Sequence, residues 1–467
     1  MRVTTSASRE RLDSEQGIAL IGVMVLLMIL SVAISAMSVS GRTEITISRR
    51  HETGAQAQAA AEAGLNHAVE LVLANLNRWE ADGLPTTSAA VTASLLGPDG
   101  LAGTAESDAD NGSLEALGLP RLPGRTTLQG VTGEQYDARL FDEDDPGRGL
   151  TLSADDIGGI GEDAVVTTDS NASIVIQATG YASDGATTTL EAIASPIGLP
   201  AIVSNGKLRV QGNVTIDGVN GSVHSNDELE LVGNPTVSRD ATATYAYTTS
   251  GDPTVGGQAG AGRPTMPVPP IAAIDYRWKA DLILQADGRM TTQDGTVTCD
   301  ASAVSTACET AGYLWQFTGG SWRLNTNSIA GPGNHQTYYA ETDALISGSP
   351  GTSAAPLAMT VISEGSISVT GSPTIEANTP ELLFVTDLDL KIAGNLKQVG
   401  AEARTLVHEQ LSISGNASLA GELLIEDASA IGSLVLENKF FGGTIRITNN
   451  DSLTPRVFAV RGWREVR

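Results

Sequence analysis

The feature that most constrains this fold is an uncharged segment near the N-terminus. The 25 residues from Gly17 to Gly41 contain no Asp, Glu, Lys or Arg, and no other stretch of the chain is comparable. A helix crosses the hydrocarbon core of a bilayer with about 20 apolar residues. The segment therefore predicts a helix that spans a membrane once, close to the start of the chain.

The helical pattern continues beyond the uncharged segment. Apolar residues recur at steps of four and three, which is the spacing of one helix face, and no proline occurs before Pro85. This predicts one continuous helix over residues 18–80, half in lipid and half presenting an apolar stripe to a folded body. A cleaved secretory signal is the alternative, because Ala33 and Ala36 could precede a cut. A cut there would leave the following helix without its anchor. The stripe consists of Ala57, Ala61, Leu65, Val69, Val72, Leu76 and Trp79.

The start of this helix resembles a known family. Glu15-Gln16-Gly17 followed by Ile18-Ala19-Leu20-Ile21 resembles the leader end and mature start of type IV pilin-like proteins, in which a prepilin peptidase cuts after the glycine. The stretch 48–70, with its Ala-rich AAEAG run, resembles the N-terminal family of PilX-type minor pilins in type IV pilus assembly. K-type minor pseudopilins of type II secretion begin in a similar way. The resemblance covers residues 1–80 and implies a leader, 1–17, that is cleaved between Gly17 and Ile18.

One position departs from the major pilins. They carry a glutamate as the fifth residue after the cut, and here that residue is Gly22. A carboxylate in lipid persists only where it finds a partner, which in major pilins is thought to be the N-terminal amine of a neighbouring subunit. The resemblance therefore implies a rare position, such as the filament tip or the initiating complex.

The resemblance also implies partners and a location. The partners are other pilin or pseudopilin subunits bound through the helix, inner-membrane lipid and the prepilin peptidase. The location is the inner membrane, single-pass, with the body extracytoplasmic and at the cell surface when it is part of a pilus.

The net charge bears on which macromolecules this chain can bind. With 28 basic and 54 acidic residues the formal net charge is -26, which argues against nucleic acid as a partner, because nucleic acid needs clustered Lys and Arg.

The two cysteines, Cys299 and Cys308, form no zinc-binding pattern. In an exported protein such a pair predicts one disulfide, and two unrelated buried thiols are the alternative.

The segment 81–199 reads as a loop-rich connection that contains a small antiparallel sheet packed on the helix stripe. Its strands are expected from Tyr136 and over 173–180 and 188–193. An acidic run within it, Asp142, Asp144 and Asp145, is a weak candidate for a calcium site, because Ca²⁺ takes several carboxylate oxygens. The run lacks the spacing of an EF-hand loop, and an acidic surface turn is the alternative. No cofactor is expected.

An internal repeat organises the rest of the body. A short alternating strand, a Gly-Asn turn and a second short strand recur with a period near 22, which predicts one coil of a parallel β-solenoid per repeat, like a right-handed β-helix. Glycine supplies a positive φ at the turn, and asparagine can stack with itself. The coils are expected over 200–239 and 344–467, with an insertion at 240–343. The repeats begin at Leu208, Leu229, Ile367, Leu390, Leu411 and, in a degenerate copy, Leu434.

The alternation predicts which side chains of the coils are buried. Val210, Leu231, Val369, Ile392 and Ile413 should face inward, and Arg209, Glu230, Ser368, Lys391 and Ser412 should face water. The fold class is then α+β: a long transmembrane pilin-like helix, a small antiparallel β region and an interrupted parallel solenoid.

Two features of the body bear on function. The insertion holds most of the aromatics, which form either its core or a binding surface: Tyr276, Trp278, Tyr313, Trp315, Phe317, Trp322, Tyr338 and Tyr339. The coils carry acidic residues, which could serve acid–base catalysis only if they recur at one coil position with Arg, Lys or Tyr partners. No such recurrence is visible for Asp227, Glu228, Asp387, Asp389, Glu426 and Asp427, and the five histidines are scattered.

The sequence therefore predicts no catalytic residues and no enzyme. It favours a minor pilin-like subunit for type IV pilus assembly, initiation or tip, with surface adhesion as a further role. The alternative is a membrane-anchored β-helix protein of the cell surface that binds or acts on carbohydrate.

Overall fold

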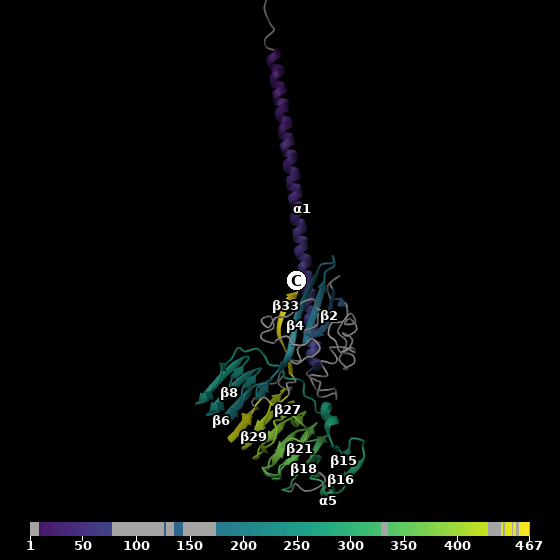
Figure 1. The fold of residues 1–467 in the computed structure, drawn as a ribbon, viewed down its shortest axis with the longest axis vertical. Coiled ribbons are helices and arrows are strands. Elements are labelled where there is room, and N and C mark those ends of the chain that lie inside the picture. The colour runs from purple at the N-terminus through teal and green to yellow at the C-terminus, as the bar shows by residue number, and fades with distance from the viewer. Residues whose placement is uncertain are drawn as a thin grey trace, which may run out of the picture.

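The computed structural model describes residues 9–76, 126–127, 135–142, 174–327, 335–427, 440–441, 444–450, 452–453 and 457–466. Within them the chain forms a long helix, a five-stranded antiparallel sheet and a stack of parallel coils (Figure 1), which confirms the α+β class and the solenoid. Most of the loop-rich connection after residue 80 and the degenerate repeat at Leu434 lie outside the described residues.

The N-terminal helix α1 (Arg9–Leu76) contains both the uncharged segment and the apolar stripe. Its C-terminal part packs on the sheet through small residues three and four positions apart. Val69, expected in the stripe, is only half-buried, and Ala68 faces the sheet at that turn. Among the described helix residues, those with buried apolar side chains are Ala57, Ala60, Ala61, Leu65, Ala68 and Val72.

Helix and sheet approach very closely. A Cβ on Gly180 would lie 2.0 Å from the carbonyl oxygen of Ala57, so only glycine fits there. Near Gly64 the Tyr136 ring packs on the helix, and His67 Nδ1 lies 2.7 Å from the Tyr136 hydroxyl. The AAEAG run is thus the part of α1 that allows this contact.

The sheet has the strand order β1-β2-β3-β4-β33, and we call it, with the helix residues packed on it, the stem. Every pairing in it is antiparallel. The last strand differs from expectation: the C-terminal segment was assigned to the coils, but it pairs with β4 because the chain leaves the solenoid beside the point where it entered. The strands are β1 (Thr126–Thr127), β2 (Gln135–Asp142), β3 (Ile174–Tyr181), β4 (Thr187–Ile197) and β33 (Val457–Val466).

The solenoid has three faces, each a ladder of parallel strands. The first face is, in spatial order, β13 (Ala259–Gly260), β10 (Ala241–Ala243), β7 (Val223–Ser225), β5 (Ile202–Ser204), β30 (Leu423–Ile425), β27 (Arg404–Val407), β24 (Leu382–Thr386), β21 (Leu357–Ser363), β19 (Gln336–Ala340) and β14 (Leu282–Leu284).

The second and third faces run beside it in the same order. The second is β11 (Ala246–Gly251), β8 (Glu228–Gly233), β6 (Leu208–Asp217), β31 (Phe440–Phe441), β28 (Leu411–Ile413), β25 (Leu390–Ile392), β22 (Ile367–Val369), β20 (Ala344–Ile346) and β18 (Ser321–Leu324). The third is β12 (Thr254–Val255), β9 (Thr236–Val237), the end of β6, β32 (Thr444–Thr448), β29 (Ala417–Ala420), β26 (Lys397–Gln398), β23 (Thr374–Glu376) and the start of β21.

The stack is continuous rather than interrupted, because its two parts join in space. Ile202 of the first coil pairs with Leu423 of the last, and β6 pairs with β31 and β32. The chain therefore enters the solenoid in the middle of the stack, builds outward to residue 260, crosses to the far end and returns. Much of the expected insertion 240–343 is itself coil, since β10 to β14, β18 and β19 extend the three faces.

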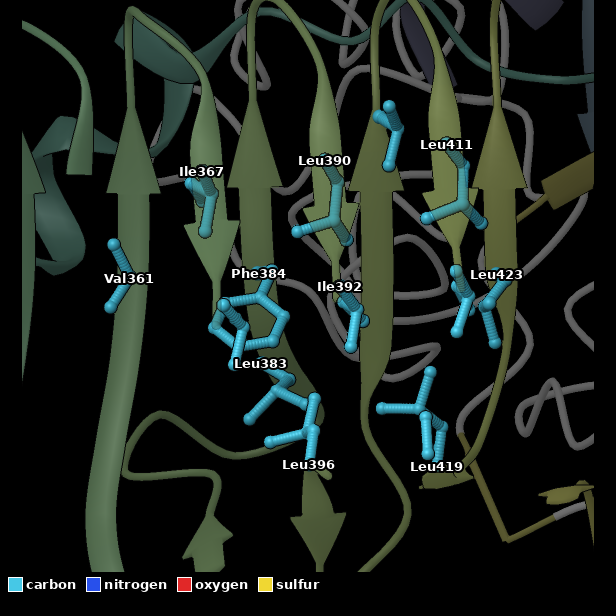
Figure 2. Close-up of a cluster of buried hydrophobic side chains, with 14 of the residues drawn as sticks. Val361, Ile367, Leu383, Phe384, Leu390, Ile392, Leu396, Leu411, Leu419 and Leu423 are labelled. Atoms are coloured by element: carbon cyan, nitrogen blue, oxygen red, sulfur yellow. The ribbon is translucent and has the colours of Figure 1, made fainter. Parts of the chain in front are cut away.

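The predicted inward ladder is confirmed. Val369, Ile392 and Ile413 stack in register and are fully buried, as are Val210 and Leu231. Figure 2 shows Ile367, Leu390 and Leu411 aligned across neighbouring strands in the same way. The intervening Lys391 is exposed. At the turn, Asn416 Nδ2 donates to Asn395 Oδ1 at 3.1 Å, so the stacked asparagines bond to one another.

The turn glycines are required for two different reasons. Gly233 has a φ of 85°, as expected. Gly394 does not have a positive φ, but a Cβ on it would lie 1.8 Å from the carbonyl oxygen of Gly371 in the adjacent coil. Close contact between coils, rather than backbone conformation, excludes other residues there.

One end of the solenoid is covered by antiparallel hairpins, seen at the lower right of Figure 1, which we call the capped end. They comprise β15 (Arg289–Thr292), β16 (Val297–Asp300), α5 (Ala307–Thr310) and β17 (Trp315–Thr318). Cys299 and Cys308 form a disulfide there, with Cα atoms 5.3 Å apart. Trp315, Trp322, Tyr338 and Tyr339 are fully buried, whereas Trp278 is 48% exposed. Most of these aromatics are therefore core.

Candidate functional site

The first candidate surface is the N-terminal half of α1. The side chains of α1 are described from residue 23 onward, and over residues 23–47 the large apolar ones lie exposed. The exposed fraction is 65% for Leu26, 71% for Met28 and 75% for Met37. Two serines here bond within the helix: Ser31 Oγ donates to the Met28 carbonyl and Ser35 Oγ to the Ser31 carbonyl, both at 2.9 Å. Such a surface suits lipid or other apolar helices, where unpaired donors are costly.

By length and composition α1 can cross a membrane, and no second such helix occurs in the described part of the chain. Gly17 and Ile18 lie in the first part of α1, and cleavage between them stays a prediction. Asp144 and Asp145 lie outside the described residues, and Asp142 ends β2. Among the described side chains, no group of three or more His, Cys, Asp or Glu is arranged to hold a metal ion.

The second candidate is a row of polar residues along the corner that follows the first face. Strand register places one residue from each of eight successive coils there, and we call this row the corner ladder. Asp387 and Glu426 both belong to it, so these two coil acids recur at one coil position, which the sequence did not make visible. In spatial order the ladder is Asn226, Asn205, Glu426, His408, Asp387, Glu364, Glu341 and Gln285.

A segment of the chain lies along this ladder. Residues 263–280, which we call the strap, include the 3₁₀ helix η2 (Ala273–Lys279) and connect the two ends of the stack. The backbone N–H of Met266 donates to Asn226 Oδ1 at 2.7 Å, and that of Ile271 donates to Glu426 Oε2 at 2.8 Å. The Ala273 N–H donates to Asp387. The ladder therefore supplies acceptors for the strap backbone.

Beneath the strap the first face is apolar on its outer side as well. Ile271 and Tyr276 of the strap pack in one cluster with residues that point outward from neighbouring strands, and this is why the first-face strands are buried on both sides. The outward residues are Val203, Leu424, Leu406, Val385, Ile362 and Tyr339.

The ionisable groups around the ladder have local partners. Burial raises the pKa of Asp387, while the Ala273 N–H and nearby His408 act in the opposite direction. His408 Nδ1 lies 2.6 Å from Glu426 Oε2, and Arg277 Nη2 lies 3.4 Å from Glu341 Oε1. The Tyr339 hydroxyl donates to Glu364, and burial raises the pKa of this phenol. These groups are arranged to hold the strap.

Glu341, Glu364, Arg277 and His408 were missed from the sequence. The repeat is most visible in the sequence on the second face, where the Gly-Asn turns lie. A usable signal existed in the polar residue that directly follows each short apolar strand of the first face, as in Val385-Thr386-Asp387 and Leu424-Ile425-Glu426.

The fold defines a class: a helix that is apolar in its exposed half, packed on a small antiparallel sheet that carries a β-solenoid. No protein-family model and no curated protein matches the sequence. Among solved structures, the chain is similar to the competence-associated pilin ComZ from Thermus thermophilus, at 13% identity and a TM-score of 0.30, over 89% of this chain and 97% of that one. A likeness at this score carries no conclusion about this chain.

Proposed function

We propose that this chain is a non-enzymatic minor subunit of a type IV pilus, held in the inner membrane through α1 with its solenoid on the extracytoplasmic side. The observation that supports this most is the division of α1. Over residues 23–47 its large apolar side chains are exposed, and its C-terminal part is buried on the stem through Ala57, Ala60 and Ala61. A helix built in this way can leave lipid and pack among other helices without disturbing the body.

The proposed partners follow from the same division. The exposed segment 23–47 would contact the equivalent helices of other pilin or pseudopilin subunits. Gly22 offers no carboxylate to pair with a neighbour's N-terminal amine, so we place the chain at the filament tip or in the initiating complex. The solenoid would then be carried outward, in a position suited to adhesion.

The corner ladder bears on the enzymatic alternative. A β-helix hydrolase or lyase needs carboxylates that face an open groove. Asp387 and Glu426 accept hydrogen bonds from the strap backbone, and Arg277 of the strap forms an ion pair with Glu341 of the ladder. This arrangement supports a structural role for the described acids of the ladder.

The leader provides the sharpest test. The chain is expressed with a prepilin peptidase, and the mature N-terminus is determined by mass spectrometry. We expect the mature chain to begin at Ile18. The variant Gly17→Val should retain the leader. The variant Ala36→Val should be cut after Gly17, like the unaltered chain. An N-terminus at Met37 that Ala36→Val abolishes would instead identify a secretory signal and overturn the proposal. Detection of the chain in sheared filaments separates a pilus role from one in secretion.

A further inference from the structure

The two ends of the solenoid differ. At the capped end β14 is followed by the antiparallel strands β15 and β16 and by the disulfide loop. At the other end, near β8 in Figure 1, the outermost strands are β13, β11 and β12 on the three faces. Each of these pairs with one parallel neighbour and has no partner on its outer edge among the described residues. We call these three strands the open end.

The open end also leaves the core partly uncovered. Tyr247, Thr249 and Val255 occupy the inward columns, in register with Leu229, Leu231 and Val237. The three residues of the preceding coil are fully buried, but Tyr247 and Val255 are only half-buried, and Thr249 is exposed. Solenoids normally need a cap at such a position.

The composition of the open end is unusual for this chain. Residues 241–262 contain one charged side chain, Asp252, in a protein with 18% charged residues and a net charge of -26. Natural edge strands are commonly protected by charges, particularly Lys, or by proline. Here Asp252 and Pro253 lie between β11 and β12, and neither strand carries a charge.

We propose that the open end is an interface that binds the open end of a second copy of this chain. Two copies with a charge of -26 each repel one another over most of their surface, and the open end, with Asp252 as the one charged side chain of residues 241–262, adds little to that repulsion. The capped end is covered by antiparallel hairpins and, in the described part of the chain, does not present the same three parallel edges, so we expect the pairing to close at two.

The geometry of a twofold axis fits three short edges. A copy related by a twofold axis across the solenoid presents its strands in the opposite direction, so that antiparallel pairs form between the two open ends. The inward residues Tyr247, Thr249 and Val255 of both copies then cover one another. This inference goes beyond the proposed function and does not depend on it, since it concerns the solenoid alone.

The test uses the full chain in detergent, with its mass measured by sedimentation over a range of concentrations. We expect a monomer–dimer equilibrium for the unaltered protein. Thr249→Lys should weaken the dimer about tenfold or more, because two like charges would face each other across the axis. Thr248→Lys is the matched control: Thr248 lies on the lateral face beside Glu230, so the dimer should persist.

Thr249 is exposed in the single chain, so at concentrations where both proteins are monomeric Thr249→Lys should melt at the temperature of the unaltered protein. Thr249→Asp should weaken the dimer in the same way and serves if the lysine variant does not fold. A protein that stays monomeric at every concentration would overturn the proposal. A dimer equally strong in both Thr249 variants would overturn it too, by indicating association through the apolar helices.

Discussion

At the scale of single residues, the solenoid is held by like side chains stacked on like. Ile392 lies between Val369 and Ile413 in register and is fully buried, and its neighbour Lys391 points to water. Period-two alternation therefore assigns opposite environments to adjacent residues.

This contrast gives a direct prediction for stability. Ile392→Asp would place an unpaired carboxylate between two coils and should cost on the order of 4 kcal/mol. Lys391→Asp should change the free energy of unfolding by no more than about 0.5 kcal/mol. Thermal melts of the two variants are the measurement, and equal losses at both sites would contradict the assigned alternation.

At the scale of elements, the strap depends on the carboxylates beneath it. The folded-state pKa of Asp387 is raised by burial. A raised pKa means that the folded chain disfavours the ionised form of Asp387. The contribution of this carboxyl group to the free energy of unfolding is therefore fully present below the ordinary carboxyl pKa range and is lost as the pH rises through the raised pKa.

Asp387→Asn should therefore raise the melting temperature at pH 7, because the amide stays neutral and its oxygen still accepts the Ala273 N–H. The difference from the unaltered protein should close as the pH falls below the ordinary carboxyl range. Asp294→Asn is the control of opposite sign. The Thr292 hydroxyl and the Thr296 N–H lower the pKa of Asp294, so this variant should lose stability at pH 7. An Asp387→Asn variant that is less stable than the unaltered protein at pH 7 would contradict the electrostatic account.

At the scale of the whole molecule, the chain enters and leaves the solenoid in the middle of the stack. Residues far apart in sequence are therefore neighbours: Thr215 pairs with Arg446, and Arg446 in turn pairs with Ser418. Both connections to the stem leave from this region, since β4 leads into β5 and β33 follows β32.

Engineered cysteines test this closure. Adjacent parallel strands lie about 4.8 Å apart, within the range that a disulfide can bridge. Thr215→Cys with Arg446→Cys should form a disulfide in oxidised protein, read as a shift in non-reducing electrophoresis after proteolysis. Thr215→Cys with Ser418→Cys should not, because these positions lie two strands apart. Efficient bridging of the second pair alone would mean that the last coil does not lie beside the first.

Much of this architecture is local and could be predicted from sequence. The uncharged segment and the small-residue stripe of α1 specify a helix and its buried face, since a period of 3.6 is written in consecutive residues. The alternation within each repeat specifies which side chains enter the core, as Ile392 and Lys391 show. Both patterns depend only on residues that lie close together in the sequence.

The order of the coils and the corner ladder were decided by tertiary structure alone. Nothing near Ile202 indicates that it pairs with Leu423 rather than with a coil that follows it in sequence. The ladder has the same origin, because Glu364, Asp387 and Glu426 come together only once the first-face strands are in register. Parallel pairing joins residues that chain connectivity leaves far apart, so local patterns determine the coil and only packing determines the stack.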